Sequence, residues 1–138
     1  MTKNSPLLPI STSFLDTVTA QAQASPRLRM NYNFHDGPES PSQRLLNGLE
    51  PGTVLPVHRH RHTQETYVLL RGRLKVKTFD DDGKQQEELE LNPLKGAYGV
   101  NIPKGTWHTI EVLESGTVIF EVKDGPYALL GEEDMLAV

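Results

Sequence analysis

Hydrophobic and polar side chains alternate with a period of two along much of this chain. In residues 28–34 the apolar positions are Leu28, Met30, Tyr32 and Phe34, and polar side chains stand between them. This period predicts a β-strand with one apolar and one polar face. Further short β-like runs follow at 43–49, 54–60, 65–71, 73–79, 86–91, 97–102, 107–113 and 117–122. Turn signals that contain Gly or Pro separate most of them, and strands at this spacing predict an all-β sandwich or barrel.

The chain before residue 26 has a different pattern. An apolar stripe at helical spacing consists of Phe14, Leu15, Val18 and Ala22. Ser13 followed by Asp16 resembles a capping box, and Pro26 ends the predicted helix. We therefore divide the chain into an N-terminal arm with a short helix, residues 1–25, and a barrel domain, residues 26–138. A mobile arm is the alternative for the first part.

Two predicted strands are apolar on both faces, at residues 67–70 and 118–120. A strand of this kind is covered on both sides. The N-terminal helix could cover the outer side, and so could a second copy of the chain. We favour a homodimer, and the alternative is that the leader and the tail supply all the cover.

Composition narrows the function classes. The 138 residues are enough for one domain. The absence of cysteine excludes disulfides, thiolate metal sites and cysteine nucleophiles. A net charge of −4, from 14 basic and 18 acidic residues, gives no basic surface for nucleic acid. No apolar stretch approaches the ~20 residues that a membrane-spanning helix needs. We expect a cytoplasmic protein that binds a small molecule.

Four of the five histidines fall in two places. His58 and His60 are two residues apart, so on a strand they face the same side. A four-residue hairpin loop would place Glu65 opposite His60, with Cβ atoms about 4.5–5.5 Å apart. His108 begins another strand, which a closed barrel would bring to the same end. We interpret His62 as a rim residue, because it lies inside the predicted loop.

Three imidazoles and one carboxylate suit a divalent transition metal ion, such as Fe, Mn, Ni, Zn, Cu or Co. On an octahedral ion, the ligands His58, His60, Glu65 and His108 would leave two positions open. Open positions are typical of a catalytic site rather than a structural one. The alternative is a solvated basic strand end that holds no metal.

The spacing of these residues resembles two motifs of the cupin superfamily. The segment from Gly52 to Gly72 resembles the first motif, with its ligand positions at His58, His60 and Glu65. The segment 103–108, Pro-Lys-Gly-Thr-Trp-His, resembles the core of the second motif. The resemblance implies a cupin double-stranded β-helix, which is a jelly-roll barrel, with His108 as the fourth ligand.

A narrower resemblance covers about residues 26–127. The segments 27–35, 43–47, 79–83 and 121–127 are similar to those of WbuC-type cupin fold metalloproteins. This resemblance implies one bound metal ion and an association with bacterial surface-polysaccharide and O-antigen sugar synthesis. The tail after Tyr127 departs from the ending of that family.

Other polar residues are candidates for binding a substrate. These are Arg29, Asn31, Asn33, His35, Gln43, Arg44, Tyr67 and Tyr98. The first four share one strand face, which would line the barrel mouth or face solvent. An arginine there would bind a carboxylate or phosphate through two hydrogen bonds. The tyrosines would offer a phenol to the substrate or pack in the core.

Three functional hypotheses remain. The first is a metal-dependent enzyme, such as an isomerase, epimerase or oxygenase, that acts on a sugar or sugar-nucleotide intermediate. The second is a non-catalytic binding or regulatory cupin. The third is histidine acid–base chemistry without a metal. The fold alone does not separate them, because barrels of this kind carry many functions.

Overall fold

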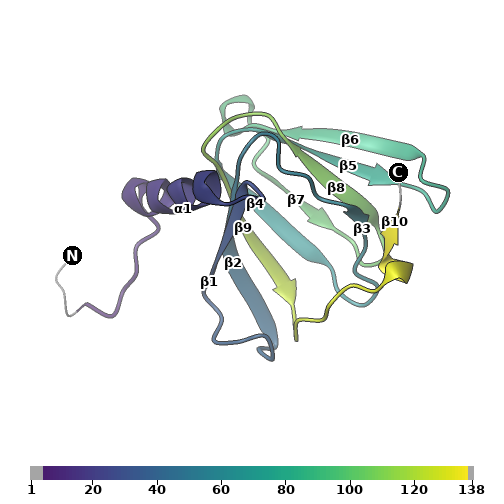
Figure 1. Ribbon diagram of the computed structural model, residues 1–138, viewed down its shortest axis with the longest axis horizontal. Helices are drawn as coiled ribbons and strands as arrows, with labels where there is room; N and C mark the ends of the chain where they lie inside the picture. Colours follow the sequence, from purple (N-terminus) through teal and green to yellow (C-terminus); the bar gives the residue numbers. More distant parts are fainter. Residues whose placement is uncertain (1–4, 137–138) are drawn as a thin grey trace.

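The computed structural model describes residues 5–136, which form two five-stranded antiparallel sheets with one helix outside them (Figure 1). The helix α1 spans Thr12–Ala24. The strands are β1 Arg29–Asn33, β2 Ser42–Leu49, β3 Val57–His58, β4 Glu65–Arg71, β5 Leu74–Phe79, β6 Gln85–Leu91, β7 Gly99–Ile102, β8 Trp107–Val112, β9 Thr117–Asp124 and β10 Met135–Leu136. Short 3-10 turns lie at Pro93–Lys95 and Glu132–Asp134. The all-β sandwich predicted from the sequence is confirmed.

The two sheets differ in the order of their strands along the chain. The first sheet has the order β1-β2-β9-β4-β7, and the second has the order β10-β3-β8-β5-β6. The chain crosses repeatedly from one sheet to the other, and one of these crossings lies between β3 and β4. Strands that are distant in sequence become neighbours, and this places the ends of β3, β4 and β8 close together.

An apolar core fills the space between the sheets. Its buried members are Leu49, Tyr67, Leu69, Leu74, Val76, Leu91, Ile102, Ile110, Val112 and Ile119. Both sheets contribute, because alternate residues of each strand point inward. Burial of this apolar surface is the main favourable term that holds the two sheets together.

The helix α1 covers the outer face of the first sheet. A second apolar cluster there consists of Leu15, Val18, Leu46 and Val118. Gly48 on β2 allows the close approach, because a Cβ atom at this position would lie 2.8 Å from Val18 Cγ1. No helix within residues 5–136 is long and apolar enough to cross a membrane.

The helix begins earlier than the sequence pattern predicts. Ser11 is the N-cap, and its hydroxyl accepts a hydrogen bond from the Phe14 backbone N–H at 3.3 Å. The predicted capping box of Ser13 and Asp16 is wrong. The Asp16 carboxylate instead accepts a hydrogen bond from Arg71 Nη1 at 2.7 Å, which fastens the helix to the end of β4.

The strands that are apolar on both faces have different cover. On β9, Val118 and Phe120 pack beneath α1. On β4, Tyr67 and Leu69 point into the core, but Val68 and Leu70 on the outer face are 40% and 37% exposed. Within the described chain, the predicted two-sided cover therefore holds for β9 and is incomplete on β4.

The strand predicted at 54–60 is much shorter, and a C-terminal strand was not predicted. Only Val57–His58 pairs as β3, because the chain leaves the sheet directly afterwards. Met135 of β10 pairs with His58. Asp134 fastens this tail, since its carboxylate accepts hydrogen bonds from Arg59 Nε at 3.1 Å and Arg61 Nε at 2.6 Å.

Candidate metal centre

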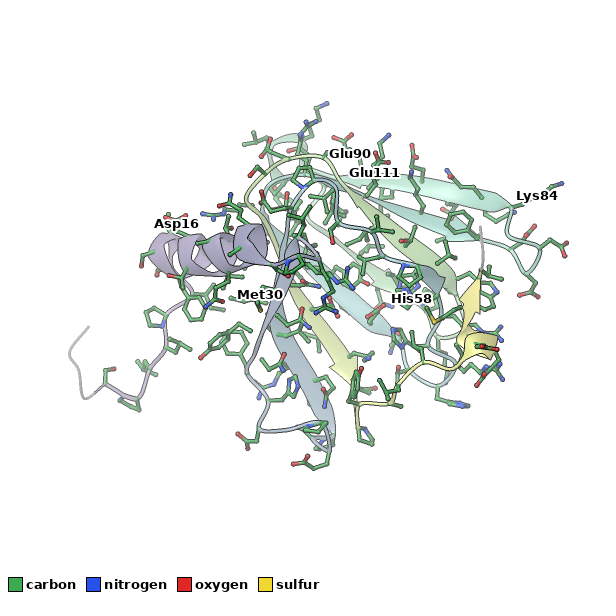
Figure 2. All side chains as sticks on the ribbon, in the orientation of Figure 1. Asp16, Met30, His58, Lys84, Glu90 and Glu111 are labelled. Atoms are coloured by element: carbon green, nitrogen blue, oxygen red, sulfur yellow. The ribbon has the colours of Figure 1, made fainter. Side chains whose placement is uncertain are left out.

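Three imidazoles and one carboxylate converge between the two sheets. His58, labelled in Figure 2, ends β3 and is the direct cross-strand partner of His108 on β8. Glu65 begins β4 in the other sheet, and His60 lies on the connection between the sheets. One donor atom of each residue lies within 4.8 Å of the others. These four residues could hold one metal ion.

The residues converge as the sequence predicts, but by a different route. The predicted hairpin between His60 and Glu65 is wrong, because Glu65 pairs with Ile102 of β7 and Lys123 of β9. Residues 59–64 instead cross from the second sheet to the first. His60 Nε2 then lies 3.6 Å from Glu65 Oε1 across the sandwich.

Two of the histidines are oriented by the same local contact. His58 Nδ1 lies 2.9 Å from the Pro56 carbonyl oxygen, and His108 Nδ1 lies 2.9 Å from that of Thr106. Each carbonyl stands two residues before its histidine. A ring that donates its Nδ1–H to a backbone carbonyl presents the Nε2 lone pair, which is the usual arrangement around a metal ligand.

The Glu65 and His108 side chains are 3% and 1% exposed, and their contact tests whether the donor set fits a cation. His108 Nε2 lies 2.7 Å from Glu65 Oε1, and the Tyr67 hydroxyl donates to the same oxygen at 3.0 Å. With its proton on Nδ1, neutral His108 would place a lone pair against a carboxylate oxygen. A shared cation removes this repulsion, so the donor set fits a divalent metal ion.

Burial and local charge keep the ligands in the protonation state that metal binding needs. Loss of hydration lowers the pKa of His58, and it lowers the pKa of His60 to about 4 despite the Glu65 charge. Burial alone would raise the pKa of Glu65, but its close contact with His108 and the nearby histidines lower it to about 2. At neutral pH the imidazoles of His58 and His60 are therefore neutral and the Glu65 carboxyl is ionised.

Two adjoining cavities open beside the cluster. The first has a volume of about 320 Å³ and is lined by ligands of the cluster together with Arg29, Asn31 and Tyr67. The second has a volume of about 620 Å³ and is lined by Asn31, Asn33, His35 and Gln43, among others. The polar face predicted for residues 29–35 therefore borders these cavities, although Asn31 and Asn33 remain exposed to solvent.

The other predicted substrate residues lie in different surroundings. Arg44 is exposed and lines neither cavity, and Tyr98 is 61% exposed and also lines neither. The structure does not bring Arg44 and Tyr98 to these cavities, and their substrate role stays a prediction. His62 is exposed and outside the cluster, as its interpretation as a rim residue expects. Tyr67 is buried and positions Glu65 through its hydroxyl.

Several cavity residues were missed by the sequence pattern. Glu121, Lys123 and Tyr127 line both cavities, and Asn47 lines the first. Burial and the Glu65 charge raise the pKa of Glu121 to about 7. The sequence held one signal for these residues. Glu121 and Lys123 are charged residues that directly follow the apolar run 118–120, and the strand that contains them pairs with β4.

Comparison with known proteins places the chain in a family. A family model matches residues 10–91, which is more than half of the chain. The chain belongs to this family, which is described as a domain of unknown function, DUF6016. The matched part includes His58, His60 and Glu65, whereas His108 lies beyond it. No curated protein matches the DUF6016 chain.

Solved structures show that this DUF6016 chain has a cupin fold. KdgF from Halomonas sp. is 16% identical with a TM-score of 0.54, over 72% of this chain and 82% of that one. The Cnp3 cupin domain of Schizosaccharomyces pombe is 11% identical with a TM-score of 0.56, over 70% and 64%. BH2720 from Bacillus halodurans is 16% identical with a TM-score of 0.56, over 95% and 91%. The cupin jelly roll predicted from the motifs is confirmed, and the narrower WbuC-type resemblance stays a prediction.

Removal of one imidazole should abolish metal retention. We expect His58→Ala and His60→Ala each to retain less than a tenth of the metal held by the unchanged protein, because each removes one of four ligands. Elemental analysis of tag-free protein measures the occupancy. His62→Ala is the matched control and should retain the full amount. Full occupancy in either ligand variant would show that the assignment is wrong.

Acid should release the metal well below the range of an exposed histidine. The pKa of His60 is about 4 in the folded chain, against about 6.5 for a free imidazole. Between pH 6.5 and 4, His60 binds a proton in the unfolded chain but not in the folded chain. The free energy of unfolding therefore decreases as the pH falls through this range. We expect full metal occupancy at pH 6 and loss below about pH 4, measured by elemental analysis after dialysis. A midpoint near pH 6.5 would contradict the buried neutral ligands.

Proposed function

We propose that this protein is a mononuclear metal enzyme that acts on a sugar or sugar-nucleotide intermediate. The observation that carries the proposal is a four-residue donor set of which three members, His58, His60 and Glu65, line a cavity that has room for a small molecule. On an octahedral ion, four protein ligands would leave two positions for water or substrate. Pockets that hold small ligands have volumes of about 300–1,000 Å³. The two adjoining cavities fall in this range.

The metal would be held by His58, His60, Glu65 and His108. When bound, a divalent transition metal ion supplies Lewis-acid chemistry at a substrate oxygen or a water molecule. Fe, Mn, Ni, Zn, Cu and Co all suit imidazole and carboxylate ligands, so availability would decide among them.

The remaining groups of the cavity would orient the substrate and move a proton. Tyr67 holds Glu65 in place and is itself buried with a raised pKa, so it stays a neutral donor. Glu121, with a pKa of about 7, can hold or release a proton near neutral pH. It receives a hydrogen bond from Asn47 Nδ2 at 3.3 Å, which fixes its direction.

Elemental analysis and a substrate panel test this proposal. We expect about one transition metal ion per chain and turnover of at least one sugar or nucleotide sugar, followed by chromatography. Chelation and the His108→Ala change should each abolish turnover. Saturable binding without product over hours would favour the non-catalytic binding protein. Turnover that survives both changes would favour metal-free acid–base chemistry by the histidines.

A homodimer is part of the proposal, and the uncovered face of β4 supports it. Val68 and Leu70 are exposed beside the area that α1 covers. We expect light scattering to give twice the monomer mass, and the double change Val68→Glu and Leu70→Glu to give a monomer. Leu89→Glu on β6 of the other sheet is the control and should stay dimeric. A monomeric unchanged protein would contradict the dimer.

The O-antigen association and the cytoplasmic location stay predictions from the sequence.

A further inference from the structure

Basic side chains of the metal-site cavity have no acidic partner in the described chain. Arg27, Arg29 and Lys123 line this cavity. Within residues 5–136, none of the three forms an ion pair with a carboxylate. The acidic residues of the same cavity are Glu65, which belongs to the metal cluster, and Glu121. Cations therefore outnumber carboxylates even before a divalent metal ion adds its charge.

The two best-placed cations keep donor groups available. Arg29 uses Nη1 to donate to the Val54 carbonyl oxygen at 3.0 Å and to the Thr53 hydroxyl at 3.4 Å, so the described contacts leave its other nitrogens available. This contact holds the guanidinium at the cavity wall. Lys123 stands opposite Glu65 in the pairing of β9 with β4, and its Nζ lies 5.8 Å from the centre of the Tyr127 ring.

Lys123 also marks the junction of the two cavities. It lines both of them, together with Asn31, Glu121 and Tyr127. A group bound beside Lys123 therefore has the metal cluster on one side and the second cavity, of about 620 Å³, on the other. This space suits a ring-sized ligand with a charged substituent better than a two-carbon acid.

A polar side chain in the same cavity lacks a partner. Asn47 is 9% exposed, and its buried Oδ1 has no hydrogen-bond partner within the described residues. Its Nδ2 donates to Glu121 Oε1 at 3.3 Å. In either orientation of the amide, one polar atom faces Glu121 and the other is left unsatisfied. A buried polar group without a partner is unfavourable, and a ligand hydroxyl group at this position would supply the missing hydrogen bond.

We infer that the ligand of this cavity is a hydroxylated anion, a sugar acid or a sugar phosphate, whose charge lies between Arg29 and Lys123 while a hydroxyl group faces Asn47. This inference rests on the proposed function and specifies its substrate class. Arginine and lysine both bind carboxylate and phosphate oxygens through charge-assisted hydrogen bonds. A sugar acid and a sugar phosphate share this chemistry, and a comparison of their affinities identifies which of the two the cavity prefers.

Calorimetric titration of the protein as purified, with its metal, tests the charge. The probes are D-glucuronate, D-glucose 6-phosphate and D-glucose, which share a ring and differ in charge. We expect one anion to bind at least ten-fold more tightly than D-glucose, and the tighter anion identifies carboxylate or phosphate. Lys123→Met should weaken the binding of that anion about ten-fold, because it removes one charged hydrogen bond. The exposed turn change Lys84→Met should alter it less than two-fold.

An acid without hydroxyl groups tests whether a ligand hydroxyl group binds at Asn47. Cyclohexanecarboxylate has a ring and a carboxylate but no hydroxyl groups, so we expect it to bind at least ten-fold more weakly than D-glucuronate. Asn47→Leu should reduce that difference. Equal binding of D-glucose and the anions, no binding of any probe, or unchanged affinity in Lys123→Met would overturn the inference. Equal binding of the two acids would overturn its hydroxyl part.

Elemental analysis of the same samples separates this inference from the proposed metal function. A protein without metal that still prefers anions through Lys123 would disprove the metal function and leave the ligand class intact. A protein with full metal and no anion preference would do the reverse. Lys123→Met should keep its metal, because Lys123 is not among the four donors.

Discussion

The contact between Glu65 and His108 is the constraint on which the site depends. One residue begins a strand of the first sheet, the other lies on a strand of the second, and their side chains meet at 2.7 Å. Both side chains are almost fully buried, so this end of the sandwich contains charged and polar groups beside an apolar core cluster. Buried charges persist only when they are paired or bound to metal. The Tyr67 hydroxyl donates to Glu65, and a metal ion held by the four residues would supply the opposite charge.

Local spacing made His58, His60 and Glu65 candidate donors and the cupin resemblance added His108, but neither gave the geometry in which they meet. His58, His60 and Glu65 lie within eight positions of sequence, so a hairpin and a crossing between sheets both bring them together. The pattern of apolar residues is the same in both cases, because the period of two does not report which sheet a strand joins. The pairing of His58 with His108 depends on a contact between strands 50 positions apart, and only the assembled sandwich shows it.

The limits of the fold prediction have similar causes. Alternation located the central strands well, since burial on one face governs their sequence. It failed where side-chain contacts decide the local structure. Ser11 rather than Ser13 caps α1, and Asp16 pairs with Arg71 instead of closing a capping box. The C-terminal strand was missed because two residues carry no period, and Arg59 and Arg61 hold it through Asp134.

The role of a basic side chain in this protein depends on where it lies. Arg71 fastens α1, and Arg59 and Arg61 fasten the tail, each against a carboxylate. Arg29 is different, because burial and the charge of Arg27 both lower its pKa, and neither effect is offset by an acidic partner in residues 5–136. A fold gains no stability from holding two guanidinium groups together at a cavity wall. The anion inferred for this cavity would relieve the repulsion between the two guanidinium groups on binding.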